Sequence, residues 1–246
     1  PTRRSSDLRD LHDVDAMQAA AEQGGEAVVI GGGLLGLEAA DGRAKRGMKA
    51  TVIHLVDVLM ERQLDEAAGR LLEKALIERG VASILNAQSE AILGETHVEG
   101  LKLKDGRVIP CSLLVMAVGI RPHVEPARSA GLTVERGIVV DDQMRTLDPD
   151  IFAVGECVQH RGQCYGLVAP IWDMCRTLAD VLTEKNPDAA FVGTSLATRL
   201  KVSGVDLYSA GQFGGGEGCE DIVFRDPGRG VYKRIVIKDD KLVGTV

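Results

Sequence analysis

The sequence predicts an α/β fold in which a parallel sheet is layered with helices and antiparallel strands follow. Short apolar runs, residues 28–30 (VVI) and 113–118 (LLVMAV), have the composition of fully buried parallel strands. Segments with apolar residues along one helical stripe alternate with these runs, and residues 64–79 are the clearest example. Beyond Asn186 and Pro187 the pattern changes to strand-like runs joined by turns, which indicates a second, β-rich part.

The helices are expected where this stripe is followed by a stop signal. Glycines at 24, 47 and 80 end the first three, because glycine readily takes the left-handed conformation that closes a helix. Asp13 can cap the first helix. The expected helices are residues 12–23, 34–46, 64–79 and 168–182, the last interrupted near Pro170.

The strands are expected in the apolar runs between the helices. The expected buried strands are residues 27–30, 49–55, 81–86, 113–118, 137–140 and 150–154. Residues 87–110 alternate in polarity around an Asp105-Gly106 turn, which predicts a β-meander. Residues 200–246 read as further strands, with Asp239-Asp240 as the corner of the last hairpin.

Three glycines lie between the first buried strand and the next helix. Gly31, Gly33 and Gly36 have the spacing G-x-G-x-x-G within the sequence AVVIGGGLLGLEAA. Gly31 permits a tight turn, Gly33 lets a pyrophosphate approach the backbone, and Gly36 lets the helix pack closely on the strand. This pattern favours a dinucleotide site over a purely structural glycine turn.

The start of the following helix supports the same interpretation. The free N–H groups there, at Leu34 and Leu35, favour the negative charge of a phosphate. With the strand 49–55, the motif completes a βαβ unit of about 30 residues, as a Rossmann-like dinucleotide-binding domain requires.

The second strand of such a domain usually ends in an acid that binds the adenosine ribose 2′-hydroxyl. His54 occupies that position here, Asp57 is an alternative acid, and Arg62 is the nearest arginine. His54 can bind a 2′-hydroxyl or, when protonated, a 2′-phosphate, or it can be a surface histidine. The sequence therefore leaves NADH and NADPH open.

Two other acids are candidates for binding a cofactor. Glu38 lies in a largely apolar helix beside the glycine motif, and it is either a ligand contact or a solvent-facing residue. Gly155 and Glu156 follow the expected strand 150–154, where a carboxylate can meet a ribose or ribitol hydroxyl. Many strands end in this way, so this second signal alone is weak.

The composition excludes several classes of protein. A formal charge of −7 over 246 residues argues against binding to nucleic acid or to anionic membranes. No apolar stretch approaches the roughly 20 residues that a membrane helix needs. Five cysteines without a C-x-x-C pair predict no metal site and indicate reduced thiols in the cytoplasm, although Cys157 and Cys164 are a candidate redox pair. No hydrolase or nucleotide-triphosphatase motif is present, and no catalytic nucleophile is expected.

Three segments occur in a characteristic order: residues 28–40, then 113–122 (LLVMAVGIRP), then 146–156 (TLDPDIFAVGE). Together they resemble the pyridine-nucleotide-disulfide oxidoreductase superfamily of FAD-dependent proteins. The resemblance implies that the first segment binds NAD(P)H and that the third contacts FAD. The residues it marks are Gly31, Gly33 and Gly36 at the pyrophosphate, Glu38 near the nicotinamide, Ala117 and Gly119 along the cofactor's path, and Gly155 and Glu156 at FAD.

Longer segments narrow the resemblance. Residues 54–65 (HLVDVLMERQLD), 155–173, 197–213 and 229–244 are similar to the large subunits of NAD(P)H-dependent assimilatory nitrite reductases, and His54 and Glu156 fit that group. The resemblance implies hydride transfer from NAD(P)H to FAD, followed by electron transfer to an iron–sulfur cluster and sirohaem, where nitrite is reduced to ammonia. It implies downstream redox modules or a small subunit as partners, and it allows a homodimer.

The family's own first G-x-G-x-x-G, which binds FAD, has no counterpart in this sequence. We therefore expect a fragment that lacks the N-terminal FAD motif and the C-terminal iron–sulfur and sirohaem modules. The expected parts are a tail and lead-in helix of the FAD domain (1–25), an NAD(P)-binding domain (26–118), a partial FAD-binding domain (119–190) and a partial β-rich, α+β interface domain (191–246).

Two other functions stay open. One is a stand-alone NAD(P)H-dependent reductase of rubredoxin or ferredoxin, or an NADH oxidase. The other, from a different class, is a nicotinamide-binding sensor domain without turnover.

Overall fold

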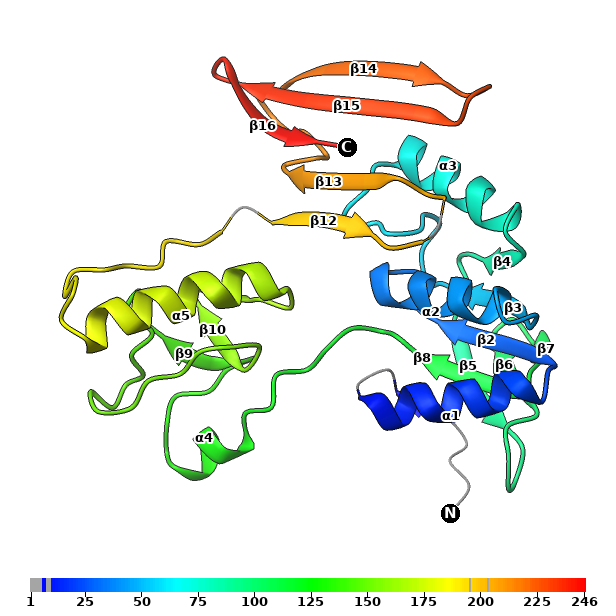
Figure 1. Ribbon diagram of the computed structural model, residues 1–246, viewed down its shortest axis with the longest axis horizontal. Coiled ribbons are helices and arrows are strands. Elements are labelled where there is room, and N and C mark those ends of the chain that lie inside the picture. Colours follow the sequence, from blue (N-terminus) through cyan, green and yellow to red (C-terminus); the bar gives the residue numbers. More distant parts are fainter. Residues whose placement is uncertain (1–5, 8–9, 195, 203) are drawn as a thin grey trace. The chain divides into compact units, whose positions relative to one another are not determined.

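The computed structural model describes residues 6–7, 10–194, 196–202 and 204–246. The chain forms two compact units (Figure 1). The first unit combines Pro1–Gly119 with Ala197–Val246, and the second is Ile120–Leu196.

A parallel sheet of five strands organises the first unit. Its order is β1-β8-β2-β3-β4, and every neighbouring pair is parallel. The strands are β1 (Ser6–Asp7), β2 (Glu26–Ile30), β3 (Lys49–Ile53), β4 (Val81–Ile84) and β8 (Leu113–Met116). The chain runs from β2 outward to β3 and β4 and then returns to β8 on the other side of β2. The order therefore reverses between β2 and β8, as in doubly wound folds, and this confirms the predicted α/β class.

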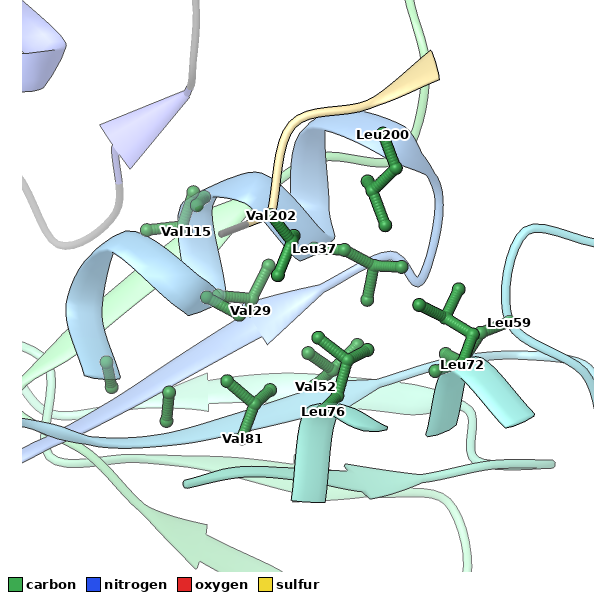
Figure 2. Close-up of a cluster of buried hydrophobic side chains, with 14 of the residues drawn as sticks. Val29, Leu37, Val52, Leu59, Leu72, Leu76, Val81, Val115, Leu200 and Val202 are labelled. Atoms are coloured by element: carbon green, nitrogen blue, oxygen red, sulfur yellow. The ribbon is translucent and has the colours of Figure 1, made fainter. Parts of the chain in front are cut away.

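Helices cover one face of this sheet. They are α1 (Leu11–Glu22), α2 (Leu34–Ala44) and α3 (Glu66–Ile77). Figure 2 shows Leu37 of α2 and Leu72 and Leu76 of α3 in one cluster with the sheet residues Val29 and Val52. All five side chains are almost fully buried, so this cluster is the main core of the first unit.

The first helix differs from its predicted form. Asp10 rather than Asp13 is the N-cap, and the two aspartates form a capping box with hydrogen bonds of 3.0 Å to each other's backbone N–H. The sequence groups residues 1–25 with the FAD-binding part. In the structure Met17 and Ala21 of α1 are buried in the core cluster of the parallel sheet, so this helix packs within the first unit.

The predicted β-meander covers the opposite face of the parallel sheet. It consists of β5 (Ser89–Leu93), β6 (Gly100–Leu103) and β7 (Val108–Pro110), paired in sequence order and antiparallel. Leu101 and Leu103 are buried against Val28, Ile53 and Leu114 in a second core cluster. The strands β2, β3 and β8 are thus buried on both faces, which explains their uninterrupted apolar sequences.

The C-terminal residues form an antiparallel sheet of order β12-β13-β16-β15-β14. Its strands are β12 (Ala197–Leu200), β13 (Leu207–Gly211), β14 (Glu220–Asp226), β15 (Val231–Lys238) and β16 (Lys241–Thr245). Asp239 and Asp240 both have positive φ, 50° and 57°, and join β15 to β16. This is the predicted hairpin corner, and the left-handed pair matches the twist of the strands.

Within the first unit, apolar and ionic contacts anchor the C-terminal sheet on the helices of the parallel sheet. Leu200 and Val202 enter the main core cluster over α2 (Figure 2). Asp65, the N-cap of α3, accepts hydrogen bonds from the Ala68 N–H (3.0 Å), from Arg234 Nη1 (2.9 Å) and from the Tyr232 hydroxyl. Burial alone would raise the pKa of Asp65, but these hydrogen bonds outweigh it and hold the pKa below its ordinary value.

The second unit contains a small sheet of order β11-β10-β9 and two helices. Its elements are α4 (Glu125–Ser129), β9 (Ile138–Val140), β10 (Val158–His160), β11 (Gln163–Cys164) and α5 (Val168–Leu182). The helix α5 is continuous through Pro170, contrary to the predicted interruption. Pro170 is the third helical residue, where the backbone N–H has no partner within the helix.

The prediction of a strand at residues 150–154 is wrong. Within it only Phe152 pairs, through an isolated bridge to Arg145, and Ile151 is 39% exposed. The Ile151 N–H donates to the Asp148 carbonyl in a turn, and the Ala153 N–H donates to the Met144 carbonyl as part of that isolated bridge.

None of the helices seen in the described part of the chain has the length and apolar character needed to cross a bilayer.

Replacing Asp65 by Asn tests the ionic anchor. Asn keeps an oxygen for the Ala68 N–H but loses the charge that faces Arg234, whose side chain is only 13% exposed. We expect the free energy of unfolding at pH 7 to fall by about 1–3 kcal/mol. Because the pKa of Asp65 is lowered by folding, its contribution is present above its ordinary value of 3.8 and is lost as the pH falls through the folded value. The difference between wild type and variant should therefore shrink on acidification.

Urea unfolding followed by far-ultraviolet circular dichroism between pH 7 and pH 3 measures this difference. Asp206→Asn is the matched control, because Asp206 is 92% exposed and its ion pair is with Arg199, which is exposed as well. A loss of stability at Asp65→Asn that does not change with pH would contradict the ionic explanation.

Candidate functional site

The loop that follows β2 turns sharply, and glycine makes the turn possible. Gly31 has φ +112°, a conformation that side chains strongly disfavour. Its N–H donates to the Ile53 carbonyl at 2.9 Å, which ties the turn to the end of β3. A Cβ at Gly31 would lie 2.3 Å from the Ala117 carbonyl oxygen after β8. The turn therefore passes over the carboxyl ends of β3 and β8 at van der Waals distance.

Gly36 brings α2 against the turn that precedes it. A Cβ at Gly36 would lie 2.0 Å from the Gly31 carbonyl oxygen, too close for any side chain. The helix can hold this position only with glycine here. Gly31 and Gly36 thus have the structural roles that the sequence spacing predicts.

Gly33 differs from both of them. No heavy atom of the described residues lies within 4 Å of the position that its Cβ would take. Gly33 is also the N-cap of α2, and no side chain caps this helix. No side chain caps the N–H groups of the first turn, at Leu34 and Leu35, and the open position at Gly33 lies at the same positive helix end, which is a suitable place for a phosphate. We call residues 31–36 the glycine turn.

The position of the glycine turn in the sheet agrees with this chemistry. The turn lies at the carboxyl ends of β2 and β8, between which the strand order reverses. In open α/β sheets this is where ligands bind. Ala117, one of the predicted cofactor residues, donates its N–H to the Ile30 carbonyl at 2.8 Å and so borders the turn. Gly119 follows with φ +102° and is exposed.

His54 is buried against the glycine turn, not on the surface. Its side chain is 10% exposed. Its Nδ1 accepts a hydrogen bond of 3.0 Å from the Gly32 N–H, and its Nε2 lies 3.1 Å from Glu61 Oε2. Because an N–H donates to Nδ1, the proton of the neutral ring is on Nε2 and is directed to Glu61. Both ring nitrogens are thus occupied by protein groups.

Gly32 and Glu61 are site residues that the sequence did not single out. A Cβ at Gly32 would lie 2.6 Å from Leu59 Cδ2 and 2.8 Å from His54 Cγ. After Gly31 and Gly36, Gly32 is therefore the third position in the glycine turn where a side chain does not fit. The run of three consecutive glycines was the signal for it. No local pattern marks Glu61, which reaches the turn only through the fold of residues 54–61.

The other charged candidates lie at the edge of this arrangement. Glu38 is half-buried, and its Oε1 accepts a hydrogen bond of 3.0 Å from the Lys201 N–H. Glu38 therefore joins α2 to the segment after β12. Asp57 is exposed. Arg62 is 82% exposed, with its Nε 3.9 Å from Glu61 Oε1.

The remaining predicted residues, Gly155 and Glu156, belong to the second unit. Gly155 has φ +109°, and no heavy atom of the described residues lies within 4 Å of its Cβ position. The α5 helix of the same unit begins after Leu167 without a side-chain cap. An open glycine turn and an uncapped helix start are features that a phosphorylated cofactor can use.

All five cysteines are free. Burial, with a smaller effect of Glu26, raises the pKa of Cys111 to about 11, and burial also raises the pKa of Cys157. These two thiols are therefore protonated and unreactive near neutral pH. Within the described residues, no cluster of histidine, cysteine and acidic side chains could hold a metal ion.

Two models of known protein families match this sequence. The model of the pyridine nucleotide-disulphide oxidoreductase family matches residues 3–169. The model of the rubredoxin NAD⁺ reductase C-terminal domain matches residues 197–246. Among solved structures, a ferredoxin reductase from Rhodopseudomonas palustris superposes with a TM-score of 0.85 at 27% identity, covering 98% of this chain and 60% of that one.

Curated relatives confirm the narrower resemblance. A nitrite reductase [NAD(P)H] of Bacillus subtilis is 49% identical over 241 residues, which are 97% of this chain and 30% of the relative. The assimilatory nitrate reductase electron transfer subunit of the same organism is 40% identical over 97% of this chain and 31% of the relative. The chain thus spans about a third of the length of these two proteins.

Alanine at Gly36 and at Gly42 tests the packing of the glycine turn. Both glycines lie in α2, but a Cβ at Gly42 meets no described atom within 4 Å. We expect Gly36→Ala to lower the free energy of unfolding by about 2 kcal/mol or more, because backbone must move. Gly42→Ala should raise it by up to about 1 kcal/mol, because alanine is the better helix former. Thermal unfolding of both variants measures the difference, and equal stabilities would show that α2 does not depend on this contact.

Proposed function

Because this chain belongs to the pyridine nucleotide-disulphide oxidoreductase family, we propose that its glycine turn binds the pyrophosphate of NAD(P)H. The observation that carries the proposal is Gly33, which combines open space at its Cβ position with an uncapped helix start. The backbone N–H groups at Leu34 and Leu35 donate to the phosphate oxygens, and the dipole of α2 adds a favourable charge. Ala117 and Gly119 border the bound dinucleotide, and Glu38 lies toward its nicotinamide end.

We further propose that the second unit contributes to an FAD site. The open turn at Gly155, the carboxylate of Glu156 and the start of α5 fit a cofactor that carries both phosphates and a ribitol chain. A bound FAD would supply the redox chemistry, as an acceptor of hydride from reduced nicotinamide and a donor of electrons to a later acceptor. The chain's own residues bind and orient the two cofactors, and none of them is needed as a nucleophile.

The reaction that these parts serve is, on this proposal, the reduction of nitrite to ammonia. The two Bacillus subtilis relatives support it, since one is a nitrite reductase and the other an electron transfer subunit of nitrate assimilation. This chain is then the electron-input portion, and the iron–sulfur cluster and sirohaem belong to other parts of the assembly or to a small subunit.

We assign NAD(P)H binding to residues 26–118, FAD contacts to 119–190 and an interface role, including homodimer formation, to 191–246. Five free cysteines support a reducing, cytoplasmic location.

A second candidate is a reductase that acts on a small electron carrier. The match of residues 197–246 to the C-terminal domain of rubredoxin NAD⁺ reductases favours it. The absorbance spectrum of the full-length gene product distinguishes the two. Flavin and sirohaem bands together support nitrite reduction, whereas flavin bands alone support the small-carrier reductase. A colourless protein that binds NADH would exclude both and leave a sensor.

Gly33→Ala tests the dinucleotide site itself. The added methyl group enters open space in the free protein, so the fold should be unaffected, but it occupies the place where the pyrophosphate meets the backbone. We expect the dissociation constant for NADH to rise by about tenfold or more, which corresponds to about 1.4 kcal/mol. Titration calorimetry with NADH measures it. Gly42→Ala is the control, because it makes the same change in the same helix away from the turn.

Equal NADH affinities of wild type, Gly33→Ala and Gly42→Ala would remove the glycine turn from the proposed site. Failure of the wild-type chain to bind either NADH or NADPH would refute the proposed function as a whole.

A further inference from the structure

The imidazole ring of His54 connects the glycine turn to the carboxylate of Glu61. The Gly32 N–H donates to Nδ1 of His54, and Nε2 of the same ring lies 3.1 Å from Glu61 Oε2. The three residues form a chain from the backbone of the turn through a buried ring to an acid whose side chain is 39% exposed. The acid is therefore held by a buried group and still open to a ligand.

The backbone on either side of Glu61 is fixed as well. Met60, which precedes it, has φ +54° and is fully buried. The Met60 N–H donates to the Gly32 carbonyl at 3.0 Å, and the Met60 carbonyl accepts from the N–H groups of Gln63 and Leu64 at 2.8 and 2.9 Å. Glu61 thus lies in a tight turn that is bonded to the glycine turn through both backbone and side chain.

The position that His54 occupies, directly after β3, has a known meaning in this type of fold. The residue directly after the second strand usually selects the dinucleotide, since an acid there binds the ribose 2′-hydroxyl. In this chain that residue is His54, and both of its ring nitrogens are engaged by Gly32 and Glu61. His54 is therefore not available to the ribose, whereas the carboxylate beyond it is.

The other charged groups nearby are less well held. Asp57 is exposed and has no hydrogen bond or ion pair in the described part of the chain. Arg62, which a 2′-phosphate would favour, is 82% exposed, and its Nε is 3.9 Å from Glu61 Oε1, beyond hydrogen-bond distance. A largely exposed arginine without a hydrogen bond at this distance gives less selectivity than a carboxylate fixed by a buried histidine.

We propose that Glu61 is the acid that binds the adenosine ribose hydroxyls, that His54 positions it, and that the site therefore selects NADH over NADPH. The proposal rests on the proposed binding of a nicotinamide dinucleotide at the glycine turn. Selection follows from charge, because the 2′-phosphate of NADPH would lie beside a fixed carboxylate and the 2′-hydroxyl of NADH donates to it.

Glu61→Gln is the first test. Glutamine keeps an oxygen that accepts from His54 Nε2–H, so the turn is preserved, but it removes the charge. Calorimetric titration of the 246-residue chain with NADH and with NADPH gives the ratio of the two affinities. We expect wild type to prefer NADH, and Glu61→Gln to reduce that preference by about tenfold or more. Asp57→Asn is the control, since it removes the same charge from the alternative acid and should leave the ratio unchanged.

His54→Asn tests the positioning role. The Asn oxygen can accept from the Gly32 N–H where Nδ1 does now, but the shorter side chain does not reach Glu61. We expect the preference for NADH to fall in His54→Asn while the thermal stability stays near that of wild type. In the double variant with Glu61→Gln, the His54 change should have no further effect on the ratio, because the two residues act as one unit.

The outcomes separate this inference from the function on which it rests. A wild-type chain that binds neither nucleotide would refute the proposed function. A chain that binds NADH with a preference insensitive to Glu61→Gln, or that prefers NADPH, would overturn only the role of Glu61. A loss of preference in Asp57→Asn instead would assign the selection to Asp57.

Discussion

The close contact between α2 and the turn before it is the constraint on which the first unit depends. Only glycine at 36 lets the helix reach the Gly31 carbonyl, and only glycine at 31 lets the turn pass the Ala117 carbonyl. Through these two contacts β2, β8 and α2 meet at one point, where the strand order of the sheet also reverses. The open space at Gly33 and the free helix start are consequences of that geometry. Gly31 and Gly36, whose close contacts hold the turn against the sheet and α2, therefore also shape the open position at Gly33.

One segment connects this site to the rest of the first unit. Residues 54–65 begin at the end of β3, fold back so that Met60 and His54 bond the glycine turn, and end at Asp65, the N-cap of α3. There the segment meets the C-terminal sheet, since Ser209 donates to the Gln63 carbonyl at 2.5 Å and Arg234 pairs with Asp65. In α2, Glu38 accepts a hydrogen bond from the Lys201 N–H. The C-terminal residues thus contact both the segment 54–65 and the helix α2, which begins at the glycine turn.

Much of this arrangement could be predicted from local sequence signals. The spacing of Gly31, Gly33 and Gly36, the Asp105-Gly106 turn and the Asp239-Asp240 corner each depend on a few adjacent residues with restricted backbone conformations. Contacts between distant residues left no such signal. Glu61 follows Met60, which adopts a left-handed conformation. Methionine rarely adopts this conformation, so the sequence does not predict the turn that brings Glu61 to His54. The segment 150–154 is apolar enough for a strand, but a turn at Asp148 and the single bridge between Arg145 and Phe152 use its backbone groups. The two contacts of His54, with Gly32 and with Glu61, likewise depend on the orientation of its ring, which the sequence does not indicate.

Amide NMR spectra of the chain during titration with NADH test the central claim most directly. If the pyrophosphate binds the backbone of the glycine turn, the N–H resonances of Gly33, Leu34 and Leu35 should show the largest shifts and should saturate together. Saturable binding of NADH that leaves these three resonances in place and shifts amides elsewhere would contradict the assignment of this turn as the dinucleotide site.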